Sequence, residues 1–412
     1  MTALLATLTA AGVAQQRRDA FVEGRDHPAI AYSTGPVTDA ATVLNRRLAE
    51  GSLHLGFDPI SGYLRSVLDA LNVPIESQAL VFSQTSSQAP LISMHNPRAV
   101  YFNDTAAVGW VRGGSQLEVM AQDGRQGPVF YVLDQRPVSV PQLTRTDQCL
   151  SCHLSWDTLG VPGLLLQSVL PLAAEKNAYA MGFVTDHRSP LSERWGGWYV
   201  TGQHGATQHL GNVPVMPADR GTGIVNPRDP LESLAGRFDL SGYPSPYSDV
   251  VPQMVLAHQS RMTNLLTRLG WEARVAIVGP GAGGDTRVQE AVNDLVDYML
   301  FVDEEALAAP VHGTSGFGER FTAQGPRDTR GRSLRDLDLQ RRLLRYPCSY
   351  MIYSDAFAAL PGPIRDRVYA RMWRILQGQE RGPRYARLSG ADRQAVIQIL
   401  RETKQDLPPF FL

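Results

Sequence analysis

The stretch AVYFNDTAAVGWVRGGSQLEVMAQDGRQGPVFYVL, residues 99–133, decides the fold class. Its short runs of Val, Tyr, Phe and Trp are separated by Gly, Asn and Asp, which is typical of antiparallel strands joined by tight turns. The dipeptide Asp123-Gly124 is a strong hairpin-turn signal between two of these runs. The strands that we expect in this stretch cover residues 99–102, 107–111, 117–120 and 129–133.

The same texture extends from Gln78 to about Val213 and includes a further expected strand over 198–200. Outside this region, apolar residues recur at helical spacing. The expected helices cover residues 38–50, 58–72, 250–269, 288–302, 334–344, 364–376 and 391–403. Ser389 and Asp392 have the spacing of a capping box at the start of the last helix.

These patterns predict an α+β protein whose N-terminal and middle part is rich in strands and whose C-terminal half is mostly helical. We expect a helix-then-β lobe over 15–215, a loop rich in Pro, Gly, Asp and Ser over 216–249, and a helical lobe over 250–412. The boundary has no clean linker, so the two lobes are expected to form one compact unit.

Composition excludes several classes of protein. The 412 residues are 43% hydrophobic and 19% charged, as in a globular protein. The 39 basic and 40 acidic residues give a net charge of −1, which argues against a protein that coats nucleic acid or an anionic membrane. No run of 18 apolar residues occurs, so we expect no transmembrane segment. Three cysteines are too few for a disulfide scaffold in a chain of this length.

The pentapeptide Cys149-Leu150-Ser151-Cys152-His153 carries the chemistry. Two thiols at this spacing can each add to a vinyl group of one haem, and the histidine that follows can then bind the iron. Two other interpretations use the same residues. A thioredoxin-like redox pair needs a βαβ context, and a zinc site needs a fourth ligand, for which no second C-x-x-C exists.

This motif resembles the haem-attachment motif of c-type cytochromes. The resemblance implies that Cys149 and Cys152 form the thioethers to one covalent haem c and that His153 is the proximal iron ligand. It covers five residues of 412. A small cytochrome c has helices around the motif and a methionine ligand downstream, whereas this motif lies in a β-rich stretch, so we do not expect that fold. The chain as a whole resembles large single-haem proteins exported by bacteria, a resemblance that brings no known activity.

Haem c is attached outside the bacterial inner membrane, so the resemblance implies a periplasmic or otherwise exported protein. Residues 1–14, MTALLATLTAAGVA, are apolar and end in small residues, as before a signal-peptidase cut at Gln15. They lack the positive charges of a typical signal peptide, and an ordinary apolar N-terminal helix is the alternative.

The sixth iron ligand would separate an electron carrier from a haem enzyme. Met254, His258 and Met262 share one face of an expected helix, and we expect His258 to be this ligand. The alternative is His204, in a segment rich in Trp and Gly, and an open position is the third outcome. We expect His187 to lie in a surface turn.

Three further features are weighed. Arg194, Arg145 and the group Arg341, Arg342 and Arg345 are candidates to pair with haem propionates by chemistry alone. Cys348, in an apolar and aromatic setting, is expected to be a buried, inert thiol. The glycines at 279, 281 and 284 resemble a dinucleotide-binding loop, but the helical pattern over 288–302 leaves no room for the next strand, so we expect a loop before a helix.

The sequence thus predicts a periplasmic haem c protein acting in electron transfer. The rival hypothesis is a haem c-dependent oxidoreductase, peroxidase-like or oxygenase-like, with an open distal site. A haem-based sensor, or a protein in which the haem only stabilises the fold, is a third class. The expected partner is a redox protein or a small-molecule substrate, and no nucleic acid.

Overall fold

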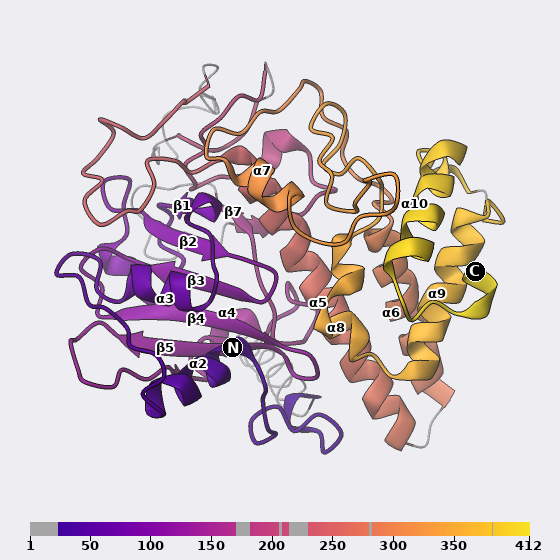
Figure 1. Ribbon diagram of the computed structural model, residues 1–412, viewed down its shortest axis with the longest axis horizontal. Helices are drawn as coiled ribbons and strands as arrows, with labels where there is room; N and C mark the ends of the chain where they lie inside the picture. Colours follow the sequence, from indigo (N-terminus) through magenta and orange to yellow (C-terminus); the bar gives the residue numbers. More distant parts are fainter. Residues whose placement is uncertain (1–23, 170–181, 206–207, 214–229, 280–281, 381) are drawn as a thin grey trace, which may run out of the picture.

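The computed structural model describes residues 24–169, 182–205, 208–213, 230–279, 282–380 and 382–412. The expected signal peptide over 1–14 lies outside them. The expected α+β class is confirmed, with an antiparallel sheet in the N-terminal and middle part and helices in the C-terminal half (Figure 1).

The sheet is a meander in which each strand pairs antiparallel with the next along the chain. Asp123 closes the predicted hairpin turn by accepting hydrogen bonds from the backbone N–H groups of Arg125 and Gln126, both at 2.8 Å. The strands are β1 (Ala79–Val81), β2 (Arg98–Phe102), β3 (Ala106–Trp110), β4 (Gln116–Asp123), β5 (Gly127–Asp134) and β6 (Thr144–Arg145). A separate pair is formed by β7 (Gln167–Val169) and β8 (Gly182–Val184).

One face of the large sheet is fully buried under the N-terminal helices α2 (Ala40–Ala49) and α3 (Leu64–Ala70). The carboxylate of Asp39 ties α2 to the sheet, because one of its oxygens accepts from Thr42 N at 2.8 Å as an N-cap and the other from Tyr131 Oη at 2.6 Å. The opposite face packs in part against the first long helix of the C-terminal half, because Phe102 on this face belongs to the same hydrophobic cluster as that helix. The helix also contacts the turn after β4, where Trp271 Nε1 donates to the Gln126 carbonyl at 3.2 Å.

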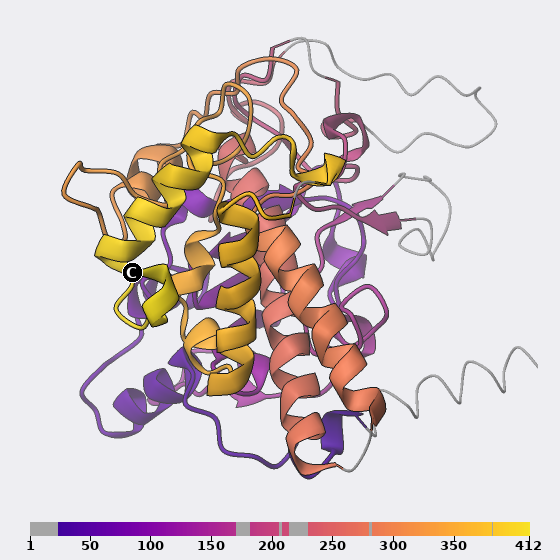
Figure 2. The same cartoon turned by 90° about the vertical axis from the view of Figure 1, so that its right-hand side faces the viewer.

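The C-terminal half is a bundle around α5, which runs between the sheet and the other helices (Figures 1 and 2). The α-helices here are α5 (Val250–Val278), α6 (Ala282–Met299), α7 (Phe317–Thr322), α8 (Asp355–Ala358), α9 (Gly362–Leu376) and α10 (Gly390–Thr403). The predicted cap of α10 is confirmed, because Ser389 Oγ accepts from Asp392 N at 3.0 Å. In the part of the chain that the structure describes, no helix combines the length and apolar character needed to cross a membrane.

The prediction of a helix over 334–344 is wrong. Turns occupy this segment, because Asp338 binds two backbone N–H groups that a helix would otherwise use, those of Gln340 at 3.0 Å and Arg341 at 2.8 Å. Leu337 also forms an isolated antiparallel bridge with Leu344, which a helix does not allow. The predicted strand over 198–200 is also wrong. Only isolated bridges form there, such as that between Val81 and Trp198, and the flanking Gly197 and Gly202 have φ of 83° and 107°.

The apolar run before Gly279 is the last turn of α5, with Val278 as its final residue, and is not a strand. Ile277 and Val278 are 65% and 63% exposed, unlike the buried strand that precedes a dinucleotide-binding loop. Gly279 therefore caps a helix, and α6 already begins at Ala282. Gly284 thus lies inside a helix and not in the expected loop, whereas Gly281 lies outside the described residues.

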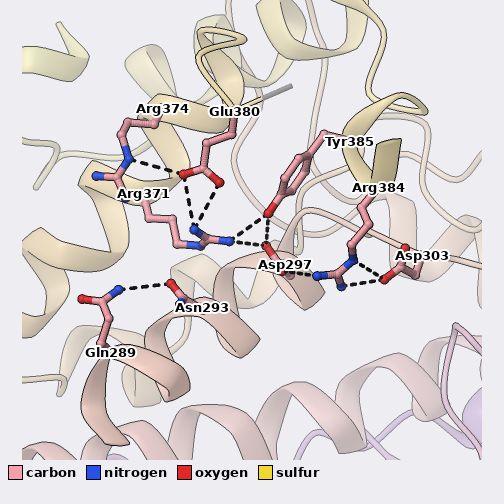
Figure 3. A network of polar contacts seen from close by, with 9 residues as sticks. All are labelled: Gln289, Asn293, Asp297, Asp303, Arg371, Arg374, Glu380, Arg384 and Tyr385. Atoms are coloured by element: carbon pink, nitrogen blue, oxygen red, sulfur yellow. Dashed lines mark hydrogen bonds and ion pairs between the residues drawn. The ribbon is translucent and has the colours of Figure 1, made fainter. Parts of the chain in front are cut away.

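A network of charges joins α6 to α9 and the segment that follows it (Figure 3). Asp297 is its centre, with oxygens 2.9 Å from Arg371 Nη2, 3.0 Å from Tyr385 Oη and 3.1 Å from Arg384 Nη1. The side chains of Asp297 and Arg371 are each 12% exposed, so this pair is shielded from water. Asp303, which binds only the outer Arg384, is 45% exposed.

Replacing Asp297 by alanine is expected to lower the free energy of unfolding by about 2–3 kcal/mol, because it leaves a half-buried guanidinium and a buried phenol with fewer partners. Asp303→Ala is the matched control, and its loss is expected to stay below about 1 kcal/mol since its ion pair is exposed. Urea unfolding monitored by circular dichroism measures both. Equal losses for the two variants would show that burial of Asp297 does not matter.

Candidate haem-attachment site

The C-x-x-C-H motif forms one helical turn, α4 (Leu150–His153), with Cys149 at its N-terminal end. His153 N donates to the Cys149 carbonyl at 2.9 Å. Residues three and four positions apart share one side of a helix, so this turn presents both thiols and the imidazole together. The backbone of α4 therefore places the side chains of Cys149, Cys152 and His153 on one side of the turn, as the motif requires.

The chain after α4 folds back on the motif. Thr158 Oγ1 closes the bend by accepting from Ser155 N at 2.9 Å, and Leu159 and Gly160 take positive φ values of 65° and 75°. This bend brings Gly163 beside His153, where Gly163 N donates to the His153 carbonyl at 2.8 Å.

The same contact orients the imidazole of His153. Its Nδ1 lies 2.7 Å from the Gly163 carbonyl oxygen, an acceptor, so Nδ1 must carry the proton and Nε2 is left with a lone pair. Among the described residues Nε2 has no hydrogen-bond partner. Burial lowers the pKa of His153, partly offset by the Gly163 contact, so the ring is neutral at pH 7. A neutral, oriented imidazole with a free Nε2 is what iron ligation needs.

Both motif cysteines are free thiols, Cys149 half-buried and Cys152 exposed. Burial raises the pKa of the Cys149 thiol to about 11, with a further increase from the nearby carboxylate of Glu118. Redox-active C-x-x-C pairs depend on a lowered thiol pKa, so this environment disfavours the thioredoxin-like interpretation.

The sheet face next to the motif is incompletely covered. Val100, Gly109, Glu118 and Val132 are cross-strand neighbours in one line over β2, β3, β4 and β5, and all of them except the glycine are half-buried. The ring of Phe130, on the same face and two residues from Val132, lies 4.8 Å from that of His153. The motif therefore adjoins a partly exposed sheet face that carries both apolar side chains and the Glu118 carboxylate.

An ion pair crosses this face. Arg98 Nη2 binds Glu118 Oε2 at 2.5 Å over Gly109, where a Cβ would lie 2.5 Å from the same Nη2. Burial opposes ionisation of Glu118, but Arg98 and the hydroxyl groups of two serines, at 86 and 87, lower its pKa to about 2. The Nε of Arg98 is buried without a hydrogen-bond partner.

These residues fit a haem attached through Cys149 and Cys152. The donor set consists of two free thiols and an imidazole with an unused Nε2, all on one turn. The half-buried apolar side chains beside the turn suit a flat macrocycle, and the unpartnered Nε of Arg98 suits a carboxylate such as a propionate.

His258 lies elsewhere in the helical half, fully buried on α5. Its Nδ1 is 2.8 Å from His187 Nδ1, and its Nε2 is 2.8 Å from Ser349 Oγ. Both ring nitrogens are therefore within hydrogen-bond distance of protein groups. The expected surface turn at His187 is wrong: the side chain is 2% exposed, and its ring stacks 3.9 Å from that of Tyr298. Among the residues that the structure describes, no hydrogen bond or ring contact joins either histidine to the motif.

His204, the alternative ligand, is also buried. Its Nε2 lies 3.2 Å from the Nε2 of His209, whose Nδ1 accepts from Gly211 N at 3.0 Å. The Trp195 ring packs against His209 with centroids 5.5 Å apart. The contacts of this pair given above are with residues of 195–211, not with the motif.

The arginines proposed by chemistry have other partners. Arg194 is 2% exposed and donates to the backbone carbonyls of Ser189 and His187. Arg145 donates to the Tyr32 carbonyl. In the third group, Arg341 and Arg342 pair with aspartates at 338 and 392, and Arg345 lies beside the Tyr346 ring.

Cys348 is fully buried, and burial raises the pKa of its thiol to about 12, as expected for an inert cysteine.

Sequence reasoning missed Arg98 and Glu118. The signal was present: β2 and β4 each carry one charged side chain, Arg98 and Glu118, on the face opposite buried apolar residues, which indicates a sheet face that is not packed shut. No sequence pattern indicates the roles of Gly163, which binds His153, or of Asn264, which binds Leu164.

Comparisons with protein-family models, with curated proteins and with solved structures found no match for this chain.

Proposed function

We propose that this chain is an exported bacterial haem c protein that acts in electron transfer. The observation that carries the proposal is the His153 Nδ1 to Gly163 carbonyl contact of 2.7 Å, which leaves Nε2 free on the same turn as two free thiols. A bound haem would supply an iron that alternates between the ferrous and ferric states.

In this proposal Cys149 and Cys152 hold the macrocycle and His153 Nε2 binds its iron. Each thiol adds across one vinyl group: the sulfur bonds to the inner vinyl carbon and the thiol hydrogen goes to the outer carbon, with no net oxidation. Cys152 is exposed, so a haem held by this thiol would be accessible to a redox partner protein or a small molecule for electron exchange. Attachment of this kind implies a periplasmic location.

The experiment is production of the full chain together with c-type maturation machinery, followed by acid–acetone extraction. Haem that stays with the protein and gives a thioether-type pyridine haemochrome supports the proposal. Complete loss of haem on extraction overturns it. Absorption spectra of the ferrous protein with and without CO then address the activity: indifference to CO indicates an electron carrier.

A haem c-dependent oxidoreductase with an open distal site is the second candidate. One observation favours it: each ring nitrogen of His258 already lies 2.8 Å from a protein group, so His258 offers no unused lone pair to iron. Rapid CO binding to the ferrous protein indicates this second candidate.

The variant His153→Ala is expected to keep the haem covalently bound while changing the spin state of its iron, because the thioethers do not depend on the imidazole. Ferric absorption spectra measure the change. His95→Ala, at an exposed position outside the motif, is the control and is expected to leave the spectrum unaltered. An unaltered spectrum in His153→Ala would contradict its role as a ligand.

A further inference from the structure

Asn264 binds the segment that orients His153. It lies in the middle of α5, is 1% exposed, and contacts a backbone one hundred residues away in sequence. Its Oδ1 accepts from Leu164 N at 2.8 Å and its Nδ2 donates to the Leu164 carbonyl at 2.8 Å. The backbone N–H and the backbone carbonyl of Leu164 are thus both bound by one amide side chain, in the way that a neighbouring β-strand would bind them.

This contact is transmitted to the imidazole in one step. Leu164 follows Gly163 directly, and the Gly163 carbonyl is the acceptor for His153 Nδ1 at 2.7 Å. The packing is close: a Cβ on Gly163 would lie 2.4 Å from Asn264 Oδ1 and 2.9 Å from Thr158 Cβ. The carbonyl therefore has little freedom to turn away while Asn264 holds its position.

Helix α5 is a rigid support for this side chain. Leu265 and Leu266, adjacent to Asn264, belong to the main hydrophobic cluster of the helical half. The orientation of a group in the β-rich part is thereby set by a helix whose own packing lies mostly in the other half of the molecule.

We infer that Asn264 is a positioning residue for His153: it holds the Gly163 carbonyl so that the imidazole keeps its proton on Nδ1 and directs Nε2 outward. The effect on iron rests on the proposed function. A hydrogen bond to the distant ring nitrogen increases electron donation to the iron, which stabilises the ferric state and lowers the reduction potential.

The test compares Asn264→Leu with Thr267→Val. The control lies one turn further along α5, is also buried and loses one hydrogen bond, from Thr267 Oγ1 to the Thr263 carbonyl at 2.8 Å, without contact to Gly163. In the full chain produced without haem, ¹⁵N NMR reports the tautomer of His153. The population with the proton on Nε2 is expected to rise about five- to tenfold in Asn264→Leu, the effect of losing one neutral hydrogen bond, and to stay at the wild-type level in Thr267→Val.

An unchanged tautomer in Asn264→Leu, with a stability loss equal to that of Thr267→Val, overturns the inference. If Asn264→Leu does not fold, Asn264→Asp decides: it keeps an acceptor for Leu164 N but repels the Leu164 carbonyl, so a smaller rise is expected and none would overturn the inference. In haem-loaded protein the reduction potential is expected to rise in Asn264→Leu only. Absence of covalent haem in the wild type rejects the proposed function, whereas the tautomer measurement still decides the role of Asn264.

Discussion

Replacing both Cys149 and Cys152 by serine is expected to abolish covalent haem attachment completely. A serine hydroxyl does not add to a vinyl group under the conditions in which a thiol does, so no carbon–oxygen link replaces the thioethers. Any haem retained by His153 alone would be lost on acid–acetone extraction. Each single variant is expected to keep one thioether, with haem yield reduced and a pyridine haemochrome shifted toward that of haem with one free vinyl group.

Cys348→Ser is the matched control, since it removes the remaining thiol of the chain. Cys348 is fully buried in the helical half, so this change is expected to reduce stability by about 1–2 kcal/mol through an added buried hydroxyl, without loss of haem. Extraction-resistant haem in the double variant would contradict attachment at the motif. Loss of haem in Cys348→Ser alone would assign the attachment to a different thiol.

The sequence was informative wherever periodicity decides the structure. The four strands expected over 99–133 and the hairpin at Asp123 are present, and they could be predicted because runs of Val, Tyr, Phe and Trp are separated by turn residues in the chain itself. The segment over 334–344 has helical spacing of its leucines, but Asp338 binds the backbone N–H groups of Gln340 and Arg341 with its side chain, and these local hydrogen bonds override the apolar pattern.

The candidate site likewise has a part that the sequence predicts and a part that it does not. The motif is local and was found from five consecutive residues, whereas its orientation depends on Gly163 and on Asn264, which is one hundred residues from its Leu164 partner. No periodicity encodes such a contact. His258 was a reasonable candidate as a histidine on a buried helix face, yet its neighbours His187 and Ser349 come from segments whose approach only the tertiary structure reveals.

Acidification is expected to destabilise the protein above the pH range in which exposed carboxylates are protonated, because three buried histidines must remain neutral in the folded state. Burial lowers the pKa of His258 and of His209 to about 3, and that of His187 well below its usual value. The hydrogen bonds of these histidines also require neutral rings. The facing Nδ1 atoms of His187 and His258, 2.8 Å apart, cannot both carry protons, and His209 Nδ1 accepts from Gly211 N.

Stability falls with pH because the unfolded chain binds more protons than the folded chain. The folded pKa values lie below the unfolded value near 6.5, so the unfolded chain binds more protons as the pH falls and stability is lost below about pH 6.5. Glu304 acts in the opposite direction, because burial raises its pKa to about 7 and the folded state then binds the proton first. Three histidines less this one carboxylate give an expected net loss of about 4 kcal/mol between pH 7.5 and pH 5, a large part of the stability of a typical domain.

Urea unfolding of the haem-loaded chain at a series of pH values measures this loss as a slope. His209→Gln and His258→Gln are each expected to reduce the slope between pH 6 and pH 5 by about 1.4 kcal/mol per pH unit, the value for one proton. His54→Gln, at an exposed position, is expected to leave it unchanged. A slope that neither buried variant alters would mean that these histidines bind protons equally in the folded and unfolded chain. The contacts of His258 with His187 and of His209 with Gly211 would then not restrict protonation, and the acid sensitivity would have to originate in the carboxylates.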